Sequence, residues 1–155
     1  MKLDARAADF IEGVGVAMQP LGAAPTAGRL LGLLLLGEKP VSLDEACRLL
    51  GASKGPVSTH ARKLLSVGLV QRVRYPRDRR DYYEAAPGTL ERLLTPRLGL
   101  AGDWGRLAAS GLDAAKPGNT VTRARLAEMR DMCEFLAGEM AAMLDRWQAA
   151  RGRLP

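Results

Sequence analysis

The sequence predicts a mainly α-helical fold with a small β-hairpin, and three observations predict it. Two short helical segments are joined by a three-residue turn that contains Gly51. A hairpin pattern with arginines at its tip follows these segments directly, over residues 69–85. Amphipathic helical patterns extend over both ends of the chain. Together they predict a winged helix-turn-helix with long terminal dimerisation helices.

The first 40 residues carry two helical patterns. A first helix, ending near residues 19–22, is predicted by apolar residues at intervals of four and three: Leu3, Ala7, Phe10, Val14, Ala17 and Leu21. Thr26 is placed to cap a second helix, which Glu38-Lys39-Pro40 closes. Leucines at positions 30, 31, 33, 34, 35 and 36 cover all sides of this second helix, so we expect it to be buried between others.

The helix-turn-helix follows from capping and turn residues. Ser42 and Glu45 have the spacing of a capping box, which predicts a short helix from Leu43 to Leu50. Residues 51–53 form the turn, and Ser53 is placed to cap the next helix. Pro56 lies in the first turn of that helix, where its missing N–H costs little. We expect its inward face to consist of Val57, Ala61, Leu64 and Leu65.

A β-hairpin is predicted directly after this helix. Gly68 can close the helix in a left-handed conformation. Residues 69–75 and 81–85 have strand patterns, and residues 76–80 form the turn between them. We expect Asp78 to orient one of the neighbouring guanidinium groups through a bidentate pair. A hairpin in this position is a wing.

The C-terminal half is predicted to be helical. A helix follows Pro87-Gly88 with a break near Thr95-Pro96, and residues 115–119 form a loop. A last helix runs from Thr120 to about Ala150. Its apolar residues form a heptad seam: Leu126, Met129, Cys133, Leu136, Met140, Met143 and Trp147.

The seam can pack onto its own chain or onto a second copy. Phe10 and Val14 of the first helix show the same alternation, so we expect the two ends of the chain to form a homodimer interface. The predicted domains are therefore a winged helix-turn-helix over residues 24–88 and a helical dimerisation region over residues 1–23 and 89–155.

Positive charge is concentrated in the predicted helix-turn-helix and wing. Residues 48–80 carry nine Lys and Arg but a single acid, Asp78, whereas the whole chain of 155 residues has a net charge of +6. A basic stripe on such a scaffold points to double-stranded DNA as the partner. We expect the DNA-binding residues to be Ser53, Lys54, Ser58, Thr59, Arg62, Lys63, Arg74, Arg77, Arg79 and Arg80.

Several classes of function are disfavoured. The chain has two cysteines, Cys47 and Cys133, and a single histidine, so we expect neither a disulfide scaffold nor a metal site of standard ligand count. No nucleophile, phosphate-loop or two-carboxylate pattern is present, and we predict neither a cofactor nor an enzymatic activity. The apolar run over residues 30–37 is too short to span a bilayer. We expect a cytoplasmic protein without a membrane partner.

Four segments resemble a known family. They are Gly28-Arg29-Leu30-Leu31-Gly32-Leu33-Leu34, Ser53-Lys54-Gly55-Pro56-Val57-Ser58, Gly68-Leu69-Val70 and Arg80-Asp81-Tyr82-Tyr83-Glu84. These segments are similar to the GbsR branch of the MarR-type winged-helix transcriptional regulators, and the likeness covers about residues 8–90. The resemblance implies a homodimeric DNA-binding regulator, often a repressor, and regulators of this type commonly respond to ligands.

These observations lead to one function and one alternative. We expect a sequence-specific transcriptional regulator, a homodimeric repressor of a pseudo-palindromic operator. A small-molecule effector could bind between the helix near Trp104 and the first helix, although a constitutive binder is an open alternative. The other reading is a winged-helix protein-interaction module without sequence-specific DNA binding.

Overall fold

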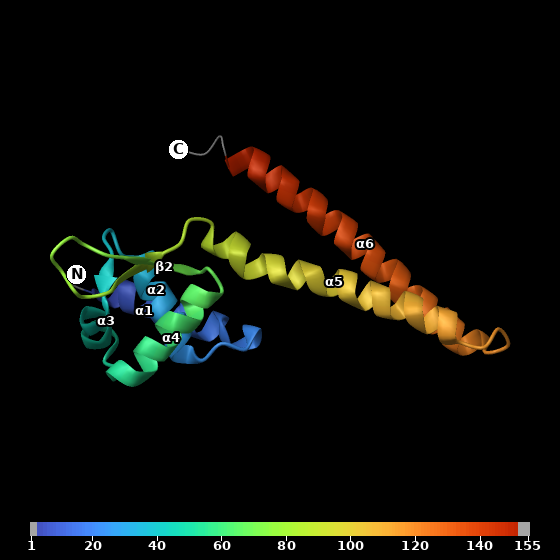
Figure 1. The fold of residues 1–155 in the computed structure, drawn as a ribbon, viewed down its shortest axis with the longest axis horizontal. Helices are drawn as coiled ribbons and strands as arrows, with labels where there is room; N and C mark the ends of the chain where they lie inside the picture. The colour runs from blue at the N-terminus through green and yellow to red at the C-terminus, as the bar shows by residue number, and fades with distance from the viewer. Residues whose placement is uncertain (1–2, 152–155) are drawn as a thin grey trace. The chain divides into compact units, whose positions relative to one another are not determined.

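The computed structural model of the protein describes residues 3–151, apart from the side chains at positions 97 and 98 (Figure 1). The ends of the predicted dimerisation region, residues 1–2 and 152–155, lie outside the described residues. In chain order the elements are α1 (Ala5–Ala17), the 3-10 helix η1 (Gln19–Leu21), α2 (Pro25–Leu35), β1 (Val41–Ser42), α3 (Leu43–Leu50), α4 (Lys54–Ser66), β2 (Val70–Val73), β3 (Tyr82–Ala85), α5 (Thr89–Ala114) and α6 (Thr120–Arg151).

The chain divides into two compact units, Met1–Leu93 and Leu94–Pro155. The predicted fold class is confirmed, since the protein is mainly helical with one small antiparallel sheet. The first turn of α5 belongs to the N-terminal unit, where the buried Thr89 hydroxyl donates to the carbonyls of Ala86 and Leu69. None of the helices between residues 3 and 151 combines the length and the apolarity that a membrane span requires.

Helix α2 is the centre of the N-terminal unit and packs against α1, α4 and β3. Leu30, Leu31, Leu33 and Leu34 are buried, as the sequence predicted, whereas Leu35 and Leu36 at the end of the helix are exposed. The predicted cap was wrong. Helix α2 begins at Pro25 after Ala24 and has no side-chain cap, so Thr26 lies inside its first turn.

The buried face of α1 differs from the predicted one. Ile11, Gly15 and Met18 are buried, whereas Phe10 is exposed and Val14 is half-buried against the core. Glycine allows α1 and α2 to pack closely, because a Cβ on Gly28 of α2 would lie 2.7 Å from the Val14 carbonyl oxygen of α1. The two backbones therefore meet at a stripe next to the one that the apolar spacing predicted.

The helix-turn-helix has the predicted boundaries. Ser42 Oγ accepts a hydrogen bond from the Glu45 N–H at 3.3 Å, and Gly51 ends α3 in the left-handed conformation with a φ of 58°. Ser53 is at the N-cap position of α4, but its side chain makes no capping hydrogen bond, contrary to the prediction. Val57, Ala61 and Leu64 form the buried face of α4.

The wing is one part of a three-stranded antiparallel sheet with the order β1-β3-β2. Val73 pairs with Tyr82 at the tip of the hairpin, and Gly68 joins α4 to β2 with a φ of 72°. The third strand, β1, was not predicted. It places Val41 opposite Tyr83 just before the capping serine of α3.

Helices α5 and α6 form the larger part of the C-terminal unit (Figure 1). The predicted break at Thr95-Pro96 is wrong, because α5 is continuous and contains Pro96 in its interior. A proline inside a helix removes one backbone hydrogen bond and crowds the carbonyl four residues earlier, which can bend the helix without ending it. The loop over residues 115–119 is present, and Asn119 Oδ1 caps α6 by accepting from the Thr122 N–H at 3.1 Å.

Candidate nucleic-acid interface

The exposed face of α4 carries most of the side chains that the sequence assigned to DNA. Thr59, Arg62 and Lys63 are exposed, whereas Ser58 is half-buried. Arg62 Nε donates to the Ser58 carbonyl at 3.5 Å, which directs the guanidinium stem along the helix. The buried face of α4 holds the helix in the core, so its other face stays open to a ligand.

Lys54 begins α4 and is paired with an acid of α3. Its Nζ lies 2.7 Å from Asp44 Oδ1, and both side chains are exposed. The hydrogen bond to Asp44 raises the pKa of Lys54, so the amine is cationic at neutral pH. This pair joins the two helices on either side of the turn, and a phosphate would have to compete with Asp44 for Lys54.

The tip of the wing is held by one carboxylate. Asp78 accepts hydrogen bonds from the Arg80 N–H at 2.9 Å, from Arg80 Nη2 at 2.6 Å and from the Tyr82 hydroxyl at 2.8 Å. The Arg80 guanidinium also lies over the Tyr82 ring, 5.3 Å from its centroid. The bidentate pair expected for Asp78 is confirmed, and Arg80 is its partner.

The other wing arginines differ in their surroundings. Arg72 and Arg74 both form ion pairs with Asp81. Arg72 Nη1 lies 3.5 Å from Asp81 Oδ2, and Arg74 Nε lies 3.6 Å from Asp81 Oδ1. Arg77 has a φ of 67°, and both Arg77 and Arg79 are exposed. Neither of these two forms an ion pair with another residue in the described range 3–151. Arg77 and Arg79 are therefore the most available cations of the wing.

An exposed basic face on the second helix of a helix-turn-helix, beside a hairpin with available arginines, defines a winged helix-turn-helix of the DNA-binding class. Comparison with known proteins gives the family. The family described as MmpR5-like MarR family transcriptional regulator matches residues 88–150. The HTH-type transcriptional regulator MmpR5 of Mycobacterium tuberculosis is 30% identical over 145 residues, which cover 93% of this chain and 88% of the relative.

Two further relatives are similar to this chain. A crystal structure of a transcriptional regulator has a TM-score of 0.72 and 30% identity, with 93% of this chain and 99% of the other covered. The HTH-type transcriptional repressor OpcR of Bacillus subtilis is 30% identical over 75 residues, which are 48% of this chain and 40% of the relative. The protein belongs to the MmpR5-like MarR family, and it is a DNA-binding transcriptional regulator.

The predicted dimer seam on α6 is divided by the structure. Its first half lies against α5 of the same chain: a Cβ on Gly105 would be 3.3 Å from Cys133 Cβ, and one on Gly111 would be 3.1 Å from Leu126 Cδ1. Met129 and Met140 are half-buried. The exposed members of the seam are Leu136, Met143 and Trp147.

Further apolar side chains of the C-terminal unit are exposed outside the seam. On α6 they include Met132 and Phe135, and on α5 they include Leu94 and a row at intervals of four and three, Leu100, Trp104 and Leu107. Among the side chains of α5 and α6 that the structure describes from Leu94 onward, the buried ones are small, Gly105 and Ala108. A heptad seam alone did not reveal this wider apolar surface, but the helical spacing on α5 is a signal that could have.

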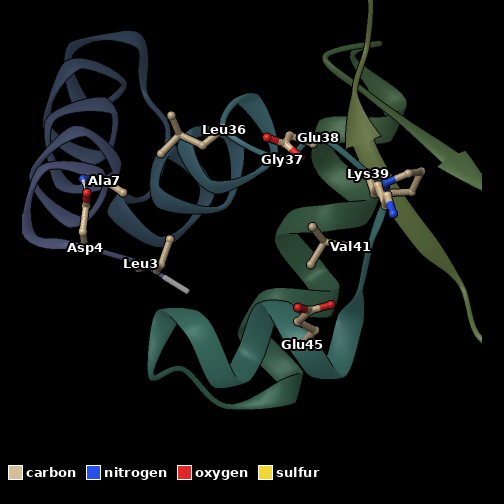
Figure 2. Close-up of a pocket in the computed structure, with 10 residues that line it drawn as sticks. Leu3, Asp4, Ala7, Leu36, Gly37, Glu38, Lys39, Val41 and Glu45 are labelled. Atoms are coloured by element: carbon tan, nitrogen blue, oxygen red, sulfur yellow. Dashed lines mark hydrogen bonds between the residues drawn. The ribbon is translucent and has the colours of Figure 1, made fainter. Parts of the chain in front are cut away.

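A pocket of about 620 Å³ lies in the N-terminal unit (Figure 2). Asp4, the N-cap residue of α1, and Ala7 of α1 line one side, the segment 36–40 crosses the top, and Val41 and Glu45 lie opposite. The walls combine apolar side chains with three carboxylates and one lysine, Lys39. Its lining residues lie between Leu3 and Glu45, so Trp104 is not one of them.

Proposed function

We propose that the protein is a homodimeric repressor that reads a pseudo-palindromic operator with α4 and holds the DNA backbone with the wing. The observation that carries this proposal is the exposed basic face of α4 opposite the buried Val57, Ala61 and Leu64. A helix of this kind fits the major groove, about 12 Å wide. In the proposal, Arg62 and Lys63 contact base edges and phosphates, and Ser53, Lys54, Ser58 and Thr59 add polar contacts.

The wing contributes electrostatic affinity in this proposal. Arg77 and Arg79 would reach the minor groove or the phosphates, because no carboxylate of the described range pairs with them. Arg74 and Arg80 are assigned weaker direct roles, since Asp81 and Asp78 lie beside them. The wing therefore combines two positioned arginines with two that are available for DNA.

We propose dimerisation through the exposed apolar stripe of the helical region. At about 100° per residue, Met132, Leu136 and Met143 lie on one side of α6, about 90° from Leu126 and Cys133, which face α5 of the same chain. Large apolar side chains in such a row are covered by a partner in most proteins. In the proposal, Phe10, which is exposed on α1, makes a second contact with the partner copy.

The proposed domains keep the boundaries that the sequence predicts. Residues 24–88 read DNA, and residues 1–23 and 89–155 form the dimer. Helix α1 has two faces in this proposal: Ile11 and Gly15 pack on α2, and Phe10 faces the partner copy. We also infer that residues 8–90 are related to the GbsR branch, on the four segments described above, and that the action is repression, as the name of OpcR states for that relative.

One experiment tests the main proposal. Sedimentation gives the mass in solution, and selection from random DNA followed by a gel shift at two salt concentrations gives the preferred site and its specificity. We expect a dimer and two half-sites about one helical turn, roughly 10 bp, apart. Sequence-independent binding, or none, would instead favour the protein-interaction module.

Ligand response is a further part of the proposal. The pocket of about 620 Å³ in the N-terminal unit lies within the range of about 300–1,000 Å³ that is usual for small-molecule sites. A ligand that favours a conformation with badly spaced reading helices by about 2.7 kcal/mol would lower the ratio of DNA-competent to DNA-incompetent protein a hundredfold. Thermal shift against a metabolite library, followed by operator release, tests this. A library without stabilisation or release would support constitutive binding.

A further inference from the structure

Arg29 of α2 contacts the two helices on either side of it. Its Nη2 donates to the Leu50 carbonyl at 2.9 Å, and its Nε lies 2.6 Å from Glu12 Oε1. Leu50 is the last residue of α3, and Glu12 belongs to α1. One side chain therefore connects α1 to the turn of the helix-turn-helix.

The carbonyl that Arg29 contacts has no partner within its own helix. The last carbonyls of an α-helix lack intrahelical donors, and Gly51 ends α3 in the left-handed conformation. The N–H groups of Gly51 and Ala52 both return to the Cys47 carbonyl, so they do not reach Leu50. Arg29 supplies the missing donor from another helix and brings a positive charge to the negative end of α3.

The contact with α1 depends on a glycine. A Cβ on Gly15 would lie 2.9 Å from Arg29 Cγ, so the absence of a side chain there lets the arginine stem lie against α1. The contact with Glu12 is an ion pair and not an aligned hydrogen bond, although the Nε atom is buried. Arginine fits this position because its planar group reaches two acceptors in different directions, whereas lysine offers one point charge.

We propose that Arg29 is a positioning residue for DNA reading. It fixes the end of α3, and thereby the three-residue turn and the start of α4, relative to α1. This inference rests on the proposed function, in which α4 reads the operator. Because α1 also carries Phe10 toward the proposed partner copy, the same side chain would transmit the position of α1 to the reading helix.

The test compares three variants of the full chain, of which Arg29→Gln and Arg6→Gln change the net charge equally. Arg29→Gln removes both contacts, Glu12→Gln removes only the ion pair, and Arg6→Gln is the control because Arg6 is exposed on the same helix as Glu12. For each variant the affinity is measured for the operator selected with the wild type and for unrelated DNA at the same salt concentration. The amide resonances of Gly51 and Ala52 are recorded in parallel.

We expect Arg29→Gln to lower operator affinity about tenfold relative to Arg6→Gln and to leave affinity for unrelated DNA equal to that of the control. The Gly51 and Ala52 amides should shift. Glu12→Gln should lose less operator affinity than Arg29→Gln. The variant that combines the two substitutions should lose no more operator affinity than Arg29→Gln alone. A merely structural role would lower both affinities in proportion to the folded fraction.

Three results would overturn the assignment. One is the same operator preference in Arg29→Gln and Arg6→Gln, and another is an equal loss on operator and unrelated DNA. If Arg29→Gln does not fold, Arg29→Lys carries the test, and full operator preference in that variant would contradict the need for two contacts. A wild type without any operator preference would overturn the proposed function itself, which distinguishes the two failures.

Discussion

The carboxylate of Asp78 holds the guanidinium of Arg80 in a bidentate pair, with Nε 3.0 Å from Oδ1 and Nη2 2.6 Å from Oδ2. Tyr82 joins the same carboxylate through its hydroxyl, and Tyr75 packs edge-on against the Tyr82 ring with centroids 4.9 Å apart. The turn of the wing is thus ordered before DNA arrives. Arg77 and Arg79 extend from an already fixed loop.

Asp78→Asn should lower operator affinity even though it makes the protein more positive. The amide cannot accept a charged bidentate pair, so the turn loses its fixed geometry. Competition gel shifts measure the effect, and Asp113→Asn, an exposed acid of α5, is the charge-matched control. Equal affinities of the two variants would show that the pair does not position the wing.

The same pair sets the pH dependence of the wing. Hydrogen bonds from Arg80 hold the pKa of the Asp78 carboxyl well below its usual range. Because folding lowers the pKa of this carboxyl, its ionised form stabilises the fold at pH values above the unfolded-state pKa of about 3.9. This contribution is lost as the pH falls through the folded-state pKa. The Asp78 carboxyl should therefore stay ionised as the pH falls through about 3.9, where an ordinary aspartate is half protonated, and carbon NMR should show its titration midpoint below that value.

Removing the available arginines should change the salt dependence of DNA binding most. Each phosphate contact contributes about −0.9 to the slope of log affinity against log salt. Arg77→Gln with Arg79→Gln should make the slope less negative by up to about 1.8, and Arg80→Gln should change it less because Asp78 already pairs with that charge. Equal slopes in the wild type and the double variant would place the wing away from DNA.

Arg62→Ala and Lys63→Ala should separate base reading from phosphate contact. Loss of an arginine that reads a base should cost about 1 to 3 kcal/mol and relax the sequence preference at one position, whereas loss of a phosphate contact should weaken all sequences equally. Selection from random DNA with each variant measures both effects. Lys116→Ala, in the loop over residues 115–119, is the charge-matched control. The assignment fails if both single variants bind as this control does.

Met143→Lys should weaken self-association without unfolding the chain. Met143 is exposed within one chain, so a charge there costs nothing until a partner covers it. We expect a larger dimer dissociation constant by sedimentation, weaker operator binding and an unchanged helix content. Ala149→Lys, near the end of α6, serves as the control. A wild type that is monomeric and still binds a single half-site tightly contradicts the dimer proposal.

Gly28→Ala should destabilise the N-terminal unit, and Gly13→Ala should not. A Cβ at position 28 would meet backbone atoms, the Val14 carbonyl oxygen at 2.7 Å and Gly15 Cα at 2.8 Å. Overpacking of this kind costs typically about 1 to 3 kcal/mol of unfolding free energy. Gly13 has no atom within 4 Å of the new Cβ, so alanine there should stabilise α1 by about 0.5–1 kcal/mol. Denaturant unfolding of both variants measures the difference.

The helix-turn-helix and wing were predictable because local residues determine them. The Ser42 and Glu45 spacing gives the start of α3, and Gly51 and Gly68 give two left-handed helix ends. Each signal depends on residues a few positions apart, so a sequence pattern contains it fully. The missed strand β1 is only two residues long and exists because β3, 40 positions away, pairs with it.

The candidate site was predictable in its residue types and less so in its pairings. The sequence placed Asp78 beside arginines, but the folded turn decided that Arg80 is the partner and that Arg77 and Arg79 are available. In the same way, the spacing on α6 gave one seam, and the contacts of Leu126 and Cys133 with α5 divided it into an inner and an outer part.

The sequence by itself determined the order of the main helices, the helix-turn-helix, the hairpin and the position of the positive charge, because capping, turn and periodicity signals act over a few residues. The tertiary structure decided which stripe of α1 is buried, that α5 continues through Pro96, and that Arg29 joins Glu12 to Leu50. These features depend on how closely two backbones approach, and the glycines that permit it act only when distant segments meet in space.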